Sequence, residues 1–167
     1  METIKIREKV TRKIMYEIER ENLNGFNFSG WNLQNADLSY FFLEDCNFAG
    51  ADLRGVDGSV ASFDGSDFFS AIMSEADFSY ASFNNSKFFM TILSHSNFKR
   101  SDFSNSNIRH TRFEFANLFG ANFTGTKFGP GTRLEQVVDF EEVIGLDRIY
   151  NPKISIDQIL SERLVPA

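Results

Sequence analysis

The sequence predicts a solenoid, and a five-residue period, an excess of phenylalanine and a column of small residues support this prediction. Starting at residue 23, every fifth residue up to 128 is large and apolar, with Gly58 as the single exception. The 22 positions hold 12 Phe, 7 Leu, one Met and one Ile. A period of five drifts around an α-helix and alternates between the faces of a strand, so the chain must turn once per repeat.

The repeat also specifies the other positions of each turn. Two residues before each large residue, the chain carries a small one from residue 36 onward, except at Phe41; typical members are Ala51, Ala61, Ala71, Ala76, Ala81, Ala116 and Ala121. Asp or Asn usually stands between the two columns, and Ser, Asn and Gly follow, which are residues that favour turns. One large and one small side chain of each repeat therefore point inward.

Blocks such as Ala36-Asp37-Leu38-Ser39-Tyr40 and Ala116-Asn117-Leu118-Phe119-Gly120 resemble the repeats of the pentapeptide-repeat family over roughly residues 21–130. The resemblance implies an all-β solenoid, a right-handed quadrilateral β-helix with four repeats per coil. At that winding the repeats make about 5.5 coils. Like residues recur 20 positions apart, as Asp37, Asp57 and Asp77 do, which agrees with a 20-residue coil.

Three segments are expected: an N-terminal capping helix at 1–20, the repeats at 21–130, and a helical cap or dimerisation segment at 131–167. Residues 4–20 show an apolar stripe at helical spacing, Ile6, Val10, Ile14 and Ile18. The large Phe26 and Trp31 of the first coil are candidates to meet this helix. Because the helix would be basic, binding to a membrane surface is the alternative to capping.

Two helices are expected after the repeats, near 133–144 and 156–164, each preceded by a capping-box spacing, Thr132 to Glu135 and Ser155 to Gln158. They either cover the last coil or form a homodimer interface, and the sequence does not choose between these roles. Within the repeats, the missing large residue at Gly58 predicts a locally loosened or bulged turn, or a loop that contacts a partner.

The sequence offers no catalytic, cofactor-binding or metal-binding constellation, so we expect no enzyme and no cofactor. His95 and His110 are expected to be exposed on different faces, and Cys46 to be a packing residue of the small column. The N-terminus has no apolar signal region and no run of about 18 apolar residues is present, so a cytoplasmic protein without a membrane span is expected. The net charge of −6 argues against direct nucleic-acid binding.

Two surface features are candidate sites for a partner protein of unknown identity. One is apolar: Phe69 and Phe89 should stack on one face, with Met90 beside them and with Ile72 and Ile92 around the corner. Docking of a terminal helix on these residues is the alternative. We therefore expect a protein-interaction or scaffold module.

The second feature is charge. Residues 21–86 carry a net charge of −9 and residues 87–130 a net charge of +4. Some pentapeptide-repeat proteins resemble duplex DNA in size and negative charge and bind DNA gyrase in its place. An acidic ladder, Asp37, Asp57 and Asp77, suits that role, whereas the basic second half departs from it. Binding to gyrase or a related topoisomerase is the alternative function.

Overall fold

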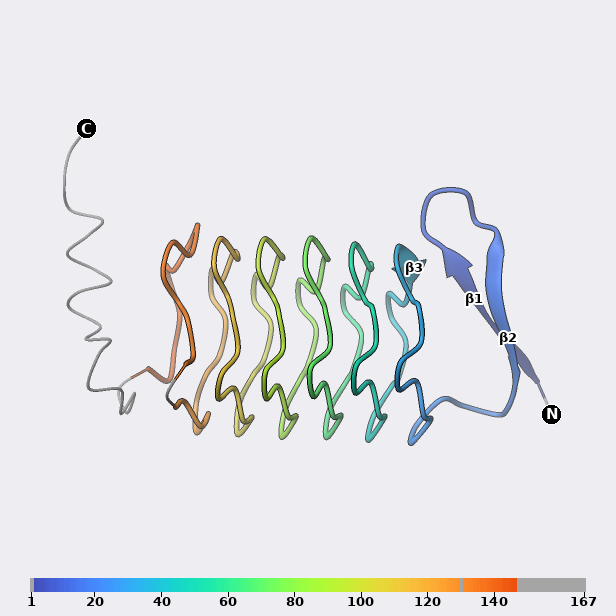
Figure 1. Cartoon of the computed structure of the whole chain (residues 1–167), viewed down its shortest axis with the longest axis horizontal. Helices are drawn as coiled ribbons and strands as arrows, with labels where there is room; N and C mark the ends of the chain where they lie inside the picture. Colours follow the sequence, from blue (N-terminus) through green and yellow to red (C-terminus); the bar gives the residue numbers. More distant parts are fainter. Residues whose placement is uncertain (1, 130, 147–167) are drawn as a thin grey trace.

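The protein is a stack of coils with a β-hairpin at its N-terminal end, as Figure 1 shows. The computed structural model describes residues 2–129 and 131–146. The hairpin consists of β1 (Thr3–Glu8) and β2 (Ile14–Glu19), and a short strand of the first coil, β3 (Ala36–Asp37), pairs with β1. The three strands form an antiparallel sheet in the order β2-β1-β3.

The coils repeat every 20 residues. Parallel bridges join each residue that precedes a large anchor to the residue 20 positions later, from Asn27 and Asn47 through to Asn107 and Lys127. Each bridge is made by backbone hydrogen bonds in both directions: the N–H of Phe68 donates to the carbonyl of Lys87 (2.8 Å), and the N–H of Lys87 donates to the carbonyl of Ser66 (2.9 Å). The predicted winding is therefore confirmed.

The anchors of the five-residue period form the core. Those from Leu23 to Phe123 are buried, and Phe128 is partly buried. Their rings stack from coil to coil, with Phe48, Phe68 and Phe88 separated by 5.0 and 4.9 Å between ring centroids. Each stacked column is in edge contact with the next, as Phe63 is with Phe68 at 5.8 Å. Such arrangements are favourable for aromatic rings beyond the area they bury.

The small inward column supplies hydrogen bonds as well as space. Most Ser and Thr at these positions donate their hydroxyls to the carbonyl of an anchor in the preceding coil, as Thr91 does to Phe68 (2.7 Å) and Ser106 to Phe83 (2.7 Å), whereas Ser101 donates to Phe98 of its own coil (2.8 Å). Across the described residues, every fully buried side-chain nitrogen or oxygen has a hydrogen-bond partner. The polar groups of the small column are thus compatible with burial.

The corners of the coils place residues in the left-handed region. At each corner the residue two after an anchor takes a positive φ, for example Gly65 (72°), Asn85 (60°) and Asn105 (59°). The residue after it closes the turn with a bond to the preceding anchor, as the N–H of Ala71 does to Phe68 (2.9 Å). Gly and Asn tolerate this conformation best, which explains why they are frequent at these positions.

The bulge predicted at Gly58 is wrong. The bridge between Asp57 and Asp77 is formed, and the N–H of Gly58 donates to the carbonyl of Asp77 (2.7 Å), as at other anchor positions. The ring of Phe78 in the next coil fills the vacant space: a Cβ on Gly58 would lie 2.5 Å from its Cε1. The absent side chain is compensated by a neighbour, so the coil stays regular.

The predicted N-terminal helix is also wrong, because residues 3–19 form the β-hairpin. The spacing of four between its apolar residues fits a strand as well as a helix, since four is a multiple of two. Ile4 pairs with Ile18 and Ile6 with Tyr16. Ile6 is fully buried, whereas Val10 lies in the hairpin turn and is 76% exposed.

The hairpin packs on the first coil. Tyr16 meets Trp31 at 4.6 Å between ring centroids and donates its hydroxyl to the carbonyl of Asn32 (2.6 Å). Ile6 and Ile18 join the core cluster. Pairing of β1 with β3 also occupies backbone groups at the edge of the first coil, where an open edge invites unwanted strand pairing. The hairpin therefore covers part of the end that the helix was expected to cover.

The helix predicted near 133–144 is replaced by further winding. Arg112 bridges to Arg133, Asn117 to Asp139 and Asn122 to Ile144, so the offset grows from 20 to 21 and then 22 residues. Leu134, Val137 and Phe140 are buried as the new inner residues. The winding therefore continues beyond residue 130, the limit expected for the repeats, although with changed spacing. The helix expected near 156–164 lies outside the described residues.

The filled space at Gly58 yields a test. Gly58→Ala, although closer to the repeat pattern, is expected to destabilise the protein by about 1–3 kcal/mol, because the new methyl group overpacks Phe78. Urea unfolding measures this difference. Adding Phe78→Leu to Gly58→Ala should recover part of this loss. The double variant should therefore lose less unfolding free energy than the two single variants lose in sum. Strict additivity would contradict this packing.

Candidate functional site

The apolar patch, defined as Phe69, Ile72, Phe89, Met90 and Ile92, is brought together as the 20-residue winding predicts. The rings of Phe69 and Phe89 stack with centroids 6.0 Å apart and planes 1° apart. Phe69 is 47% and Met90 53% exposed. Around the corner, Ile72 and Ile92 bridge to each other and are half-buried.

The patch has polar limits along the axis. In the isoleucine column, Asp52 bridges to Ile72 on one side and Arg112 to Ile92 on the other. Beyond Phe89, the imidazole of His110 meets its ring edge-on, with centroids 5.0 Å apart. The apolar residues thus occupy two consecutive coils and are bordered by groups that can form polar contacts.

The acidic ladder is formed by neighbouring bridges, Asp37 to Asp57 and Asp57 to Asp77. Each carboxylate also accepts a hydrogen bond from the backbone two residues later: from Ser39 (3.1 Å), Ser59 (3.1 Å) and Ser79 (2.9 Å). Asn97 and Asn117 continue the column and accept the same bond, at 3.2 and 3.0 Å. These aspartates are therefore turn residues as well as surface charges.

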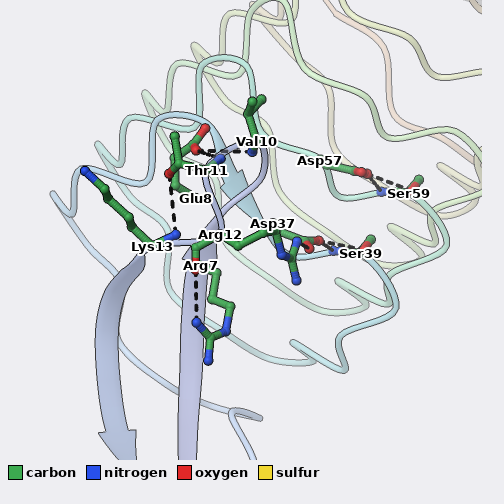
Figure 2. A network of polar contacts seen from close by, with 10 residues as sticks. All are labelled: Arg7, Glu8, Val10, Thr11, Arg12, Lys13, Asp37, Ser39, Asp57 and Ser59. Carbon is green, nitrogen blue, oxygen red and sulfur yellow. Dashed lines mark hydrogen bonds and ion pairs between the residues drawn. The ribbon is translucent and has the colours of Figure 1, made fainter.

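Asp37 differs from the rest of the ladder because the hairpin engages it. Arg12, in the hairpin turn, forms an ion pair with its carboxylate (Figure 2). Burial alone would raise the pKa of Asp37, but hydrogen bonds from Ser39 and Arg12 outweigh this effect and lower the pKa. On the other side of the hairpin turn, hydrogen bonds from Thr11 lower the pKa of Glu8.

The residues considered for chemistry have structural surroundings. Cys46 is 1% exposed and its Sγ lies 3.0 Å from the carbonyl of Leu23; burial raises the pKa of its thiol to about 11. His95 and His110 are exposed, at different corners, and His95 stacks on Phe115 at 4.8 Å. The described part of the chain contains no group of three or more His, Cys, Asp or Glu placed to hold a metal ion.

A second exposed apolar surface was missed by the sequence analysis. Tyr40, Val60 and Tyr80 form one corner column and are 71%, 46% and 55% exposed, and Phe42, just past the same corner, is 69% exposed. We call these four residues the aromatic ridge. The signal was present in the sequence, because the three corner residues are 20 positions apart, but the period had been applied to only some of the surface columns.

A family model for pentapeptide repeats matches the chain with 8 copies, at residues 27–57, 43–79 and 91–125. The chain belongs to the pentapeptide-repeat family. This membership shows a right-handed β-solenoid, consistent with the parallel bridges at 20-residue offsets. No curated protein matches the sequence.

Solved pentapeptide-repeat structures resemble the protein. Rfr23 from the cyanobacterium Cyanothece 51142 is 20% identical, with a TM-score of 0.55 over 66% of this chain and 86% of Rfr23. AT2G44920, from the Arabidopsis thaliana thylakoid lumen, is 25% identical to this chain, with a TM-score of 0.48; the match covers 65% of this chain and 69% of AT2G44920. QnrB1, a plasmid-mediated fluoroquinolone resistance protein, is 18% identical, with a TM-score of 0.48; the match covers 75% of this chain and 73% of the QnrB1 chain.

Proteins of this family generally serve structural or interaction roles rather than catalytic ones.

Within residues 2–129 and 131–146, no helix is long and apolar enough to cross a membrane.

The pairing of Asp37 with Arg12 predicts a pH-dependent contribution to stability. Asp37→Asn should lower the free energy of unfolding at pH 7 by up to about 1 kcal/mol, as for other partly exposed ion pairs. Because the folded pKa of Asp37 is lowered, the wild-type advantage is complete above the unfolded value of about 3.9 and disappears as the pH falls through the folded pKa.

Urea unfolding of both proteins at neutral pH and near pH 3 measures this difference. Asp57→Asn is the matched control, since the same turn bond is kept and no ion pair of Asp57 is found in the described chain. An equal effect of both substitutions at neutral pH would contradict a specific role for Arg12.

Proposed function

We propose that the protein is a non-enzymatic interaction or scaffold module that binds another protein through the apolar patch. The observation that carries this proposal is the stack of exposed Phe69 on half-buried Phe89, with exposed Met90 at the adjacent corner. Contiguous exposed apolar side chains rimmed by polar groups are typical of protein interfaces.

The patch is suited to binding because its backbone is rigid. Ser70, the corner residue after Phe69, donates its backbone N–H to the carbonyl of Phe89 in the next coil (3.0 Å), and Phe69 donates its own N–H to the carboxylate of Asp67 (2.9 Å). Phe89 is further held between Phe69 and His110. A partner would therefore pay little conformational entropy to order this surface, which favours affinity.

A double substitution tests the patch. Phe69→Ser with Phe89→Ser should leave the fold intact, because both rings lie outside the core, and should weaken partner binding at least about tenfold, as loss of interface aromatic anchors does. Affinity purification from the native host identifies the partner, and a direct titration with the purified partner measures the change.

Phe119→Ser is the matched control. Phe119 also directly follows an anchor, but on the opposite side of the coil, where it contacts Lys99 and Arg100. Unchanged binding by the Phe69 and Phe89 double variant would remove the patch as the interface.

The alternative function is DNA mimicry toward DNA gyrase or a related topoisomerase, and the acidic ladder favours it. Its carboxylates recur once per coil, at the strand spacing of about 4.8 Å. The charge is limited, however: Asp37 is paired with Arg12, and the column continues as Asn97 and Asn117. These limits make the interaction module the first proposal.

A gyrase supercoiling assay distinguishes the two. A DNA mimic should inhibit or protect gyrase at micromolar protein, and Asp57→Asn with Asp77→Asn should reduce this effect because electrostatic attraction is lost. Asn already serves in this column at residues 97 and 117, so the fold should be retained. Absence of any effect of the wild-type protein would contradict mimicry.

A further inference from the structure

The aromatic ridge, Tyr40, Phe42, Val60 and Tyr80, combines exposure with an unfavourable backbone. Tyr40, Val60 and Tyr80 have φ values of 62°, 61° and 60°. This region is disfavoured for residues with a Cβ, and most strongly for β-branched ones such as Val. Every corner of the solenoid takes this conformation: some corners carry Gly, as at Gly25, Gly65 and Gly125, and others carry residues with a side chain, such as Ser70, Glu75 and His95.

Stability of the fold does not account for these residues. Their side chains are 46–71% exposed, so they add little to the core, while their backbone conformation is costly. Gly or Asn at these positions would lower the conformational cost of the positive φ and would also remove the exposed apolar surface. The ridge differs from the other corners because one column exposes large apolar side chains in three consecutive coils, and contiguous exposed apolar groups are typical of interaction surfaces.

Most charges around the ridge are negative, whereas Lys99 and Arg100 lie at its far end, where the N–H of Tyr80 donates to the carbonyl of Lys99 (2.8 Å). Asp57 and Asp77 lie three residues before Val60 and Tyr80, and Glu44 and Asp64 follow the corner on the next side. In the described residues, none of the ion pairs involves these four carboxylates. The ridge ends at Arg100, the next residue of the corner column, which is already paired with Glu142 and lies 5.6 Å from the ring of Phe119.

The chain itself shows how a basic segment binds at this place. The hairpin turn brings Arg12 to Asp37, the first carboxylate beside the ridge (Figure 2). In addition, β1 pairs with the backbone at Ala36–Asp37. The next carboxylate of this column, Asp57, receives hydrogen bonds only from Ser59 within the described residues. Aromatic faces and carboxylates together attract guanidinium and ammonium groups.

We propose that the aromatic ridge is a docking surface for a basic, arginine- or lysine-bearing segment of another protein. Corner residues 60 and 80 are ten positions from 70 and 90, half of a 20-residue coil, so the ridge lies at the corner opposite the apolar patch. The proposal shares with the proposed function the idea of protein binding but uses different residues. Occupation of both surfaces would let the solenoid bridge two partners.

The probe is a short fluorescein-labelled peptide in which arginine alternates with alanine, and its binding to the full chain is followed by fluorescence anisotropy. Tyr40→Asn with Tyr80→Asn should weaken binding about tenfold, because the cation-binding rings are lost while every carboxylate remains. Asn tolerates the corner conformation, so this variant should unfold at an equal or higher urea concentration than the wild type. Reduced affinity therefore cannot result from unfolding.

Two controls distinguish peptide binding at the aromatic ridge from binding elsewhere on the protein. An alternating glutamate and alanine peptide should not bind, and Phe69→Ser with Phe89→Ser should bind the basic peptide as the wild type does. Equal affinity of the tyrosine double variant and the wild type would overturn the proposal. A concentration-dependent doubling of molar mass in light scattering, lost in the tyrosine double variant, would assign the ridge to a second copy of the chain and also overturn it.

Discussion

Vertical register is the constraint on which the rest of the structure depends: each residue lies against the residue 20 positions later. The same register aligns the backbone hydrogen bonds and the phenylalanine rings, so neither is formed without the other. In a solenoid each coil contacts mainly its neighbours, and stability is passed on from coil to coil. Most Ser and Thr hydroxyls of the small column strengthen this coupling, because they join one coil to an anchor carbonyl of the preceding coil, as at Thr91 and Ser106.

The register tolerates changes of side chain better than changes of length. At Gly58 an anchor is missing, and the ring of Phe78 fills its place without any displacement of the backbone bonds. After residue 129, added residues shift the bridge offset to 21 and 22, yet buried Leu134 and Phe140 continue the inner column. At the other end, the hairpin supplies Tyr16 and Ile18 to cover a coil whose small positions hold the large Phe26 and Trp31. The structure therefore departs from the regular 20-residue coil at its two ends rather than in its interior.

Register also converts a repetitive sequence into distinct surfaces. Outward residues 20 positions apart become vertical columns, so two or three substitutions in one column create a continuous feature. Phe69 and Phe89 form part of the apolar patch in this way, Asp57 and Asp77 part of the acidic ladder, and Tyr40, Val60 and Tyr80 the corner column of the aromatic ridge. Since the scaffold beneath them is rigid, these columns present fixed spacings to a partner. This arrangement favours binding over catalysis, which needs groups that converge on one point.

The five-residue period determined the inner columns, because one large and one small residue recur at the same place in every repeat. The winding of four repeats per coil followed from the family resemblance and from like residues 20 positions apart, and it predicted the stacking of Phe69 on Phe89. Only the tertiary structure decided the ends. A spacing of four between Ile14 and Ile18 fits strand and helix alike, and pairing with β3 selects the strand. The capping-box spacing at Thr132 was overridden because Leu134 and Phe140 are buried by continuing the solenoid. The surface partners of Asp37 and the exposure of Tyr40 likewise depend on where the hairpin packs and on which corner faces solvent, and neither is encoded in a local pattern.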